Sequence, residues 1–186
     1  MVEIIALIDK LIKEHKVIKE RVRSIEQVAN DASLLDDLAD AKDTFVPGRF
    51  DQTQQLQELQ EYLEKIDPWL QDHFCREETV LLVAVERDGD RKFIMALHDL
   101  LLEHEDLKYR VTHAREHVTE LRDGKLGRHQ WEASANDMRA HLSHTRKLLE
   151  AHAKLENDFF RDLRRHLETK MVEGSRHNDK ANNSFS

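Results

Sequence analysis

The chain has 186 residues and a formal net charge of −8, from 29 basic and 37 acidic side chains that are mixed along its length. This length suits one domain with its own core. The acidic balance and the lack of a basic stripe argue against a nucleic-acid-binding protein. The single cysteine, Cys75, excludes an internal disulfide framework and favours a reducing compartment, so we expect a cytoplasmic protein. Neither a signal-peptide pattern nor an apolar run of membrane-spanning length is present, so no membrane partner is expected.

Glycine and proline divide the chain into segments rich in Leu, Glu, Lys, Gln, Arg and Ala, which favour helices. In chain order, the pattern predicts four long helices over 2–29, 52–87, 91–122 and 129–169, with a short helix near 33–42. Pro68 should kink the second helix or restart it. Residues 30–51 should form a crossover, and we assign 1–172 to the folded bundle and 173–186 to a disordered polar tail.

Short connections around Gly89 and between Gly124 and Gly127 make neighbouring helices antiparallel. The expected fold class is therefore all-α, an up-down-up-down four-helix bundle. Such bundles build cofactor sites in the core from side chains on facing helices.

Twelve histidines are the unusual feature of the composition. Helical periodicity places one histidine on the apolar stripe of each long helix, and on two helices a glutamate follows four residues later. These inward-facing polar residues are His15; His73 and Glu77; His104; and His152 and Glu156. The two His-x-x-x-Glu spacings alone are close to chance, so the argument depends on all six residues lying on apolar stripes.

The alternative interpretation is a metal-free bundle in which the buried histidines form hydrogen bonds to the buried glutamates. Six buried polar groups are expensive to desolvate without a cation, so we favour a metal site. Imidazole and carboxylate ligands without thiolate suit iron, manganese or zinc.

The other histidines are predicted to lie mainly on the surface. His113 and His117 have ligand-like spacing but face away from His104. His141 returns to the stripe of His152, three turns away, which is too distant to share an ion with it.

With these residues, the sequence resembles the hemerythrin-like, or HHE cation-binding, domain family over roughly residues 1–168. The matching segments are Lys-Glu-His-Lys-Val-Ile around His15, His-Phe-Cys-Arg-Glu-Glu from His73, Leu-Leu-Glu-His-Glu-Asp-Leu around His104, and His-Ala-Lys-Leu-Glu-Asn-Asp-Phe-Phe from His152. The resemblance implies two non-haem iron ions bridged by oxo or hydroxo, with zinc or manganese as less favoured metals. It also implies that Glu77 and Glu156 bridge the ions and that His15, His73, His104 and His152 are terminal ligands.

The chain departs from the oxygen-carrying members, which place a second ligand histidine four residues from the first on the third helix. Leu100 and Lys108 occupy the positions four residues either side of His104. A fifth protein ligand could therefore come from Glu78, Glu103, His98 or His141, with solvent as the alternative.

The resemblance implies a protein that binds, senses or stores oxygen or a related diatomic, or iron, and we expect such a binding protein rather than an enzyme. The alternative is a di-iron redox enzyme that handles peroxide or nitric oxide or supports iron–sulfur cluster repair. A metal-free helical interaction module is a third hypothesis. The small ligand would be dioxygen, nitric oxide or peroxide, and the sequence leaves a protein partner or a homo-oligomer open.

Overall fold

The computed structural model describes residues 2–29, 50–123 and 125–182, and all of its regular elements are helical. They are α1 (Val2–Ala29), α3 (Phe50–Cys75), the π-helical turn η1 (Arg76–Leu81), α4 (Leu82–Asp88), α5 (Arg91–Leu101), α6 (His104–Arg122) and α7 (Arg128–Asn182). The predicted short helix at 33–42 and most of the predicted crossover lie outside the described residues.

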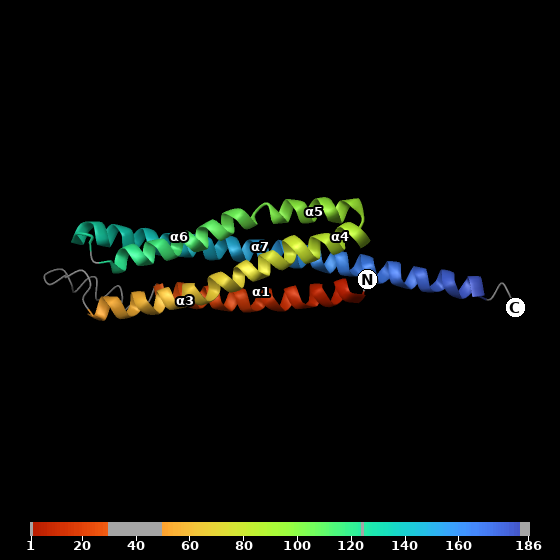
Figure 1. Cartoon of the computed structure of the whole chain (residues 1–186), viewed down its shortest axis with the longest axis horizontal. Coiled ribbons are helices and arrows are strands. Elements are labelled where there is room, and N and C mark those ends of the chain that lie inside the picture. The colour runs from red at the N-terminus through yellow and green to blue at the C-terminus, as the bar shows by residue number, and fades with distance from the viewer. Residues whose placement is uncertain (1, 30–49, 124, 183–186) are drawn as a thin grey trace.

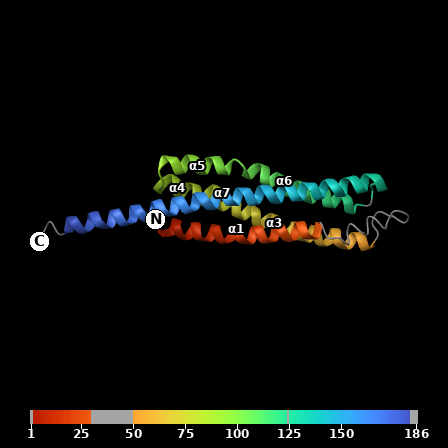
Figure 2. The same ribbon diagram turned by 180° about the vertical axis from the view of Figure 1, so that it is seen from behind.

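The helices pack as a bundle. α1 packs against α3 and α7, and α6 packs against the same two helices, which closes a ring around one core. Figure 1 shows α3, η1 and α4 rising diagonally from beside α1 to beside α5, and Figure 2 shows α7 from the opposite side. The predicted all-α bundle is confirmed. Within the described residues, no helix combines the length and the apolar character needed to cross a membrane.

The second predicted helix does not restart at Pro68, because α3 continues through this residue to Cys75. Apolar side chains on both sides of the proline, Ile66 and Leu70, are buried and hold the segment against the core. Asp67 is also buried, and its Oδ2 atom lies 2.5 Å from Nη1 of Arg115 on α6. These contacts offset the one backbone hydrogen bond that proline removes.

The third predicted helix, 91–122, is wrong as a single element because it is broken between α5 and α6. The break lies at Leu102 and Glu103, where the Glu103 amide donates to the Leu100 carbonyl over three residues rather than four. Leu102 is 77% exposed, so its side chain is not held in the core at this break. His104 therefore begins a new helix.

The fourth predicted helix ends too early, since α7 extends from Arg128 to Asn182 rather than stopping at 169. Residues 173–182, which the sequence assigns to a disordered tail, continue this helix. Figure 1 shows α7 projecting past the ends of the other helices. The division between a bundle domain at 1–172 and a separate tail stays a prediction.

Buried apolar side chains form two clusters along the bundle. One cluster includes Ile18, Leu70 and Trp131, and the other includes Leu11 and Leu163. His15 is buried on α1 between Leu11 and Ile18, so a polar layer lies between the two apolar clusters. The surrounding apolar packing positions this layer and shields it from water.

Candidate metal centre

The polar layer contains all six residues that the sequence predicts as metal ligands, and each is at most 3% exposed. Potential ligand atoms gather there in two groups that share one glutamate. The first group is His15, His73, Glu77 and Glu156, and the second is His104, His152 and Glu156. The structure thus brings the six residues together from α1, α3, η1, α6 and α7, while their role as ligands stays a prediction.

The π-helical turn η1 sets the position of Glu77. The Leu82 amide donates to the Glu77 carbonyl over five residues, which adds one residue to this turn of the helix. The extra residue shifts the helical phase, so that Leu81 is buried while Val80 is 51% exposed. Single π-helical turns of this kind are frequent at functional sites.

The first histidine pair joins α1 to α3. The Nε2 atoms of His15 and His73 lie 3.1 Å apart. Glu77 Oε1 lies 3.5 Å from the His15 Nε2 atom and 3.4 Å from that of His73. Glu156 Oε2 reaches the same place, 3.0 Å from the His15 Nε2 atom. Two imidazole nitrogens and one oxygen from each glutamate therefore surround a common point.

The second histidine pair joins α6 to α7 in the same manner. The Nε2 atoms of His104 and His152 lie 3.0 Å apart. Glu156 Oε1 lies 2.9 Å from the His152 Nε2 atom and 3.4 Å from that of His104. Glu77 Oε2 lies 3.5 Å from the His104 Nε2 atom. Each glutamate thus directs one carboxylate oxygen to each histidine pair, which is the arrangement of a bridging carboxylate.

The opposite ring nitrogen of each histidine is also held. The Nδ1 atoms of His73, His104 and His152 each lie 2.9 Å from a carboxylate oxygen, and the His15 Nδ1 atom lies 3.1 Å from an amide oxygen. The partner of His73 is Glu14, that of His104 is Glu78, that of His152 is Glu103 and that of His15 is Asn157. A carboxylate can only accept, so Nδ1–H donates outward and a neutral ring presents its Nε2 lone pair to the centre.

These outer partners follow one rule of placement. Each of the four is the sequence neighbour of an inward residue on its own segment, and each holds the histidine of the next segment around the bundle. Glu14 of α1 holds His73 of α3, and Glu78 of η1 holds His104 of α6. Glu103, just before α6, holds His152 of α7. Asn157 of α7 then holds His15 of α1 and completes the ring.

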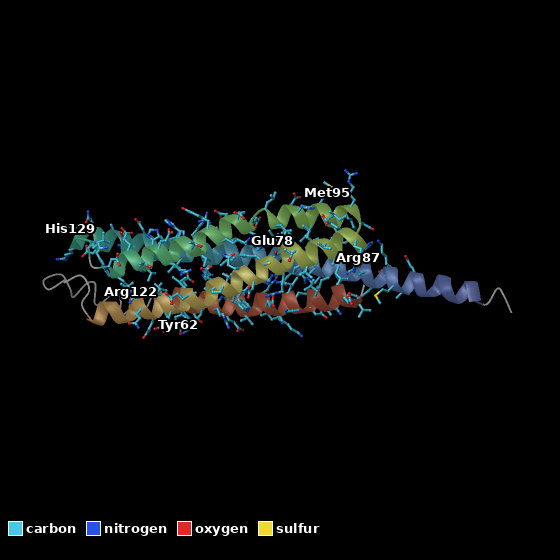
Figure 3. The ribbon with its side chains drawn as sticks, in the orientation of Figure 1. Tyr62, Glu78, Arg87, Met95, Arg122 and His129 are labelled. Atoms are coloured by element: carbon cyan, nitrogen blue, oxygen red, sulfur yellow. The ribbon has the colours of Figure 1, made fainter. Side chains whose placement is uncertain are left out.

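Sequence reasoning did not assign Glu14 or Asn157 any role, although both stand directly beside an inward residue. Glu78 and Glu103, which the sequence offers as a fifth ligand, contact the Nδ1 atoms on the outer side of the rings. Figure 3 marks Glu78 near the middle of the bundle.

The two histidines considered as a fifth ligand lie elsewhere. His98 is exposed and pairs with Glu86 at 3.6 Å, and the His141 Nε2 atom lies 2.9 Å from the Arg110 carbonyl oxygen. Neither these two histidines nor Glu78 and Glu103 belong to the two groups of ligand atoms in the buried layer.

The inner carboxylates lack the hydrogen bonds that their burial requires. Both oxygens of Glu77 and Oε2 of Glu156 are buried without a hydrogen-bond partner. Buried carboxylate oxygens in this condition are rare and costly. The outer carboxylates differ, because Arg76 lies 2.9 Å from Glu14 and Lys108 lies 2.7 Å from Glu78. The arrangement can accept positive charge between the two inner glutamates.

Without a cation, the centre can relieve its charge only by rearranging protons. Burial lowers the pKa of His15, but the close carboxylates of Glu156 and Glu77 outweigh it and raise this pKa to about 10. Burial, together with the charge on His15, lowers the pKa of His73 to about 4. Burial and the charge on Glu156 raise the pKa of Glu77 to about 8. The close imidazoles of His104, His15 and His152 overcome the effect of burial on Glu156 and hold its pKa well below the usual range.

Comparisons of this chain with protein-family models, with curated proteins and with solved structures found no match.

Proposed function

We propose that this chain is a non-haem di-iron-binding protein of the hemerythrin type, which binds, senses or stores dioxygen or a related diatomic ligand. The observation that carries the proposal is the pair of histidine pockets, each receiving one oxygen from both Glu77 and Glu156. His15 and His73 would hold one ion, and His104 and His152 the other, with the two glutamates bridging.

The nitrogen separations suit an octahedral metal such as iron or manganese more than tetrahedral zinc. Two nitrogens about 2.1 Å from one ion lie about 3.0 Å apart at a right angle and about 3.4 Å apart at the tetrahedral angle. The Nε2 separations of 3.1 Å and 3.0 Å fit right-angled positions. Such positions belong to octahedral coordination, whereas structural zinc is almost always tetrahedral.

The charge of the layer supports two cations. Glu77 and Glu156 contribute two negative charges at the centre when both are ionised, and the nearby basic residues Arg76 and Lys108 pair with Glu14 and Glu78 instead. Two divalent ions would supply the missing partners for the buried oxygens of Glu77 and Glu156.

The donor count leaves room for a small ligand. Two nitrogens and two oxygens per ion leave octahedral positions for solvent or a diatomic molecule. Aromatic rings cover the layer, with Phe74 centred 4.2 Å from His104 and Phe160 stacked 5.7 Å from His15. Bound iron would supply the redox-active centre, and these side chains would exclude bulk water from it.

A groove between α1 and α7 provides a route to the layer. Its volume is about 750 Å³, and its lining includes His15 and its outer partner Asn157. Ala153, one turn before Asn157, also lines the groove. A second groove of about 640 Å³ near Phe93 and Ala96 includes none of the six candidate ligands. A small ligand is therefore expected to approach along the α1–α7 groove.

The test is rapid mixing of the iron-loaded, reduced protein with dioxygen or nitric oxide, followed by optical spectroscopy. We expect a spectral change that reverses on removal of the gas, with no net consumption of the ligand. Repeated turnover of peroxide or nitric oxide would instead establish the enzymatic alternative. Absence of any gas-dependent change in a protein with full iron content would contradict ligand binding.

The groove offers a matched pair of variants for the same experiment. Ala153→Phe should slow the binding of the gas by filling the route near His15, without replacing any candidate ligand. Ala96→Phe adds the same bulk to the second groove and should leave the rate unchanged. Equal rates in both variants and the wild type would exclude the α1–α7 groove as the route.

A further inference from the structure

Three histidines outside the buried layer gather where α6 faces α7. They are His113 and His117 on α6 and His141 on α7, and all three are partly exposed. His113 lies nine residues along α6 from His104, which corresponds to about 14 Å of helix. We infer that these residues form a second metal site, separate from the buried centre, which takes one zinc-class divalent cation.

The separation of one ring pair matches two imidazoles bound to the same ion, and the other two separations are longer. An imidazole bound at about 2.1 Å has its ring centre about 3.2 Å from the ion, so two bound rings lie about 4.5 Å apart at a right angle and about 5.2 Å at the tetrahedral angle. The centroids of His113 and His117 lie 4.4 Å apart, and His141 lies 5.4 Å and 5.8 Å from them. The buried pairs show similar separations, 4.8 Å and 4.9 Å.

In two of the rings, a hydrogen bond fixes which nitrogen carries the proton and therefore which nitrogen has a lone pair for a metal. The His141 Nε2–H donates to the Arg110 carbonyl at 2.9 Å, which leaves its Nδ1 atom as the metal-binding nitrogen. The His113 Nδ1–H donates to Glu116 at 3.1 Å and leaves its Nε2 atom available. This is the outward anchoring by which ligand histidines are commonly oriented.

His117 supplies the observation that most directly calls for a ligand. Its Nδ1 atom is buried and has no hydrogen-bond partner. Burial, with the neighbouring charges of His113 and His141, lowers its pKa, which favours the neutral ring that can bind a cation. Glu120 and Asp137 act on the same ring with negative charge, which favours a cation nearby.

The three rings do not yet converge as the buried ligands do, since the structure brings ligand atoms within 4.8 Å of one another in the two buried groups and not in this one. Closing the site requires His113 and Glu116 to shift together so that the hydrogen bond between them is kept; their side chains are 37% and 67% exposed. Three imidazoles with solvent in the fourth position make a tetrahedral zinc site. Bound metal would join α6 to α7.

The test measures zinc bound per chain by equilibrium dialysis of the full-length, iron-loaded protein against ZnCl₂, with iron measured in parallel. We expect one zinc ion per chain that does not displace iron. His117→Ala and His141→Ala should weaken this binding by about tenfold or more. His144→Ala removes an exposed histidine three residues from His141 and is expected to bind zinc as the wild type does.

Equal zinc binding by the wild type, His117→Ala and His141→Ala would overturn the inference, as would zinc uptake matched by loss of iron. His113→Ala guards against misfolding, because it truncates a partly exposed side chain and should weaken zinc binding while leaving the melting temperature of the zinc-free protein unchanged. The comparison between the wild type and the His117→Ala and His141→Ala variants isolates the second site, because all of these proteins share the buried centre.

Discussion

Replacing Glu156 with glutamine is expected to abolish binding of two metal ions per chain. Glu156 is 2.9 Å from His152 through Oε1 and 3.0 Å from His15 through Oε2, so it contributes to both pockets. Glutamine keeps the shape but offers one acceptor oxygen, has no charge and places an NH₂ group in the other pocket. We expect metal analysis to show at most one weakly held ion per chain.

The same variant should lose the stabilisation that metal gives to the fold. Metal at about 1,000 times its dissociation constant stabilises the folded state by about 4 kcal/mol. For a chain of this length, that raises the melting temperature by about 10 °C. The wild type should show this rise on metal addition, and Glu156→Gln should show little.

Glu168→Gln is the matched control, because Glu168 is an exposed residue of the same helix that pairs with Arg164 at 2.9 Å. It should bind metal as the wild type does. If Glu156→Gln retained two ions and the full rise in melting temperature, Glu156 would not be a bridging ligand.

Metal affinity should rise steeply with pH. Below pH 8 the metal-free centre holds a proton on His15, whose pKa is raised to about 10, and another on Glu77, whose pKa is raised to about 8. Metal binding must release both. The logarithm of the overall association constant should therefore rise by about one for each pH unit between pH 8 and 10 and by about two just below pH 8, and more steeply at lower pH because the pKa of His152 is also raised.

The stability of the metal-free fold should instead fall as the pH rises. Both groups have a higher pKa in the folded chain than in the unfolded chain, so their contribution to stability is lost as the pH rises through about 8 for Glu77 and about 10 for His15. Calorimetric titration of the metal-free protein with metal, in buffers of different ionisation enthalpy, measures the protons that metal binding releases. Release of no protons at pH 7 would contradict this account of the centre.

The bundle and the grouping of the six inward residues could be predicted because helical periodicity reports which side chains share a face. Apolar residues flank His15 and His73 at helical spacing, and the burial of both follows from that pattern. The limit of periodicity lies in local changes of helical register. Neither the π-helical turn at Glu77 nor the break before His104 contains glycine or proline, so nothing in the local sequence indicates them.

The outer partners show a different limit. Glu14, Glu78, Glu103 and Asn157 each stand beside an inward residue, at positions that a single-helix pattern assigns to the boundary with solvent. Their function depends on the histidine of the adjacent segment, and the distance between helices is not contained in the periodicity of either one. Such sites nevertheless have a sequence signal, which is an acidic or amide residue directly beside each inward ligand.

The most direct test of the di-metal centre is an anomalous difference map at the iron absorption edge, from crystals of protein expressed with iron. The account predicts two peaks, one between His15 and His73 and one between His104 and His152, with Glu77 and Glu156 reaching both. A fully iron-loaded protein with no peak in this layer, or with iron bound only elsewhere on the chain, would contradict it.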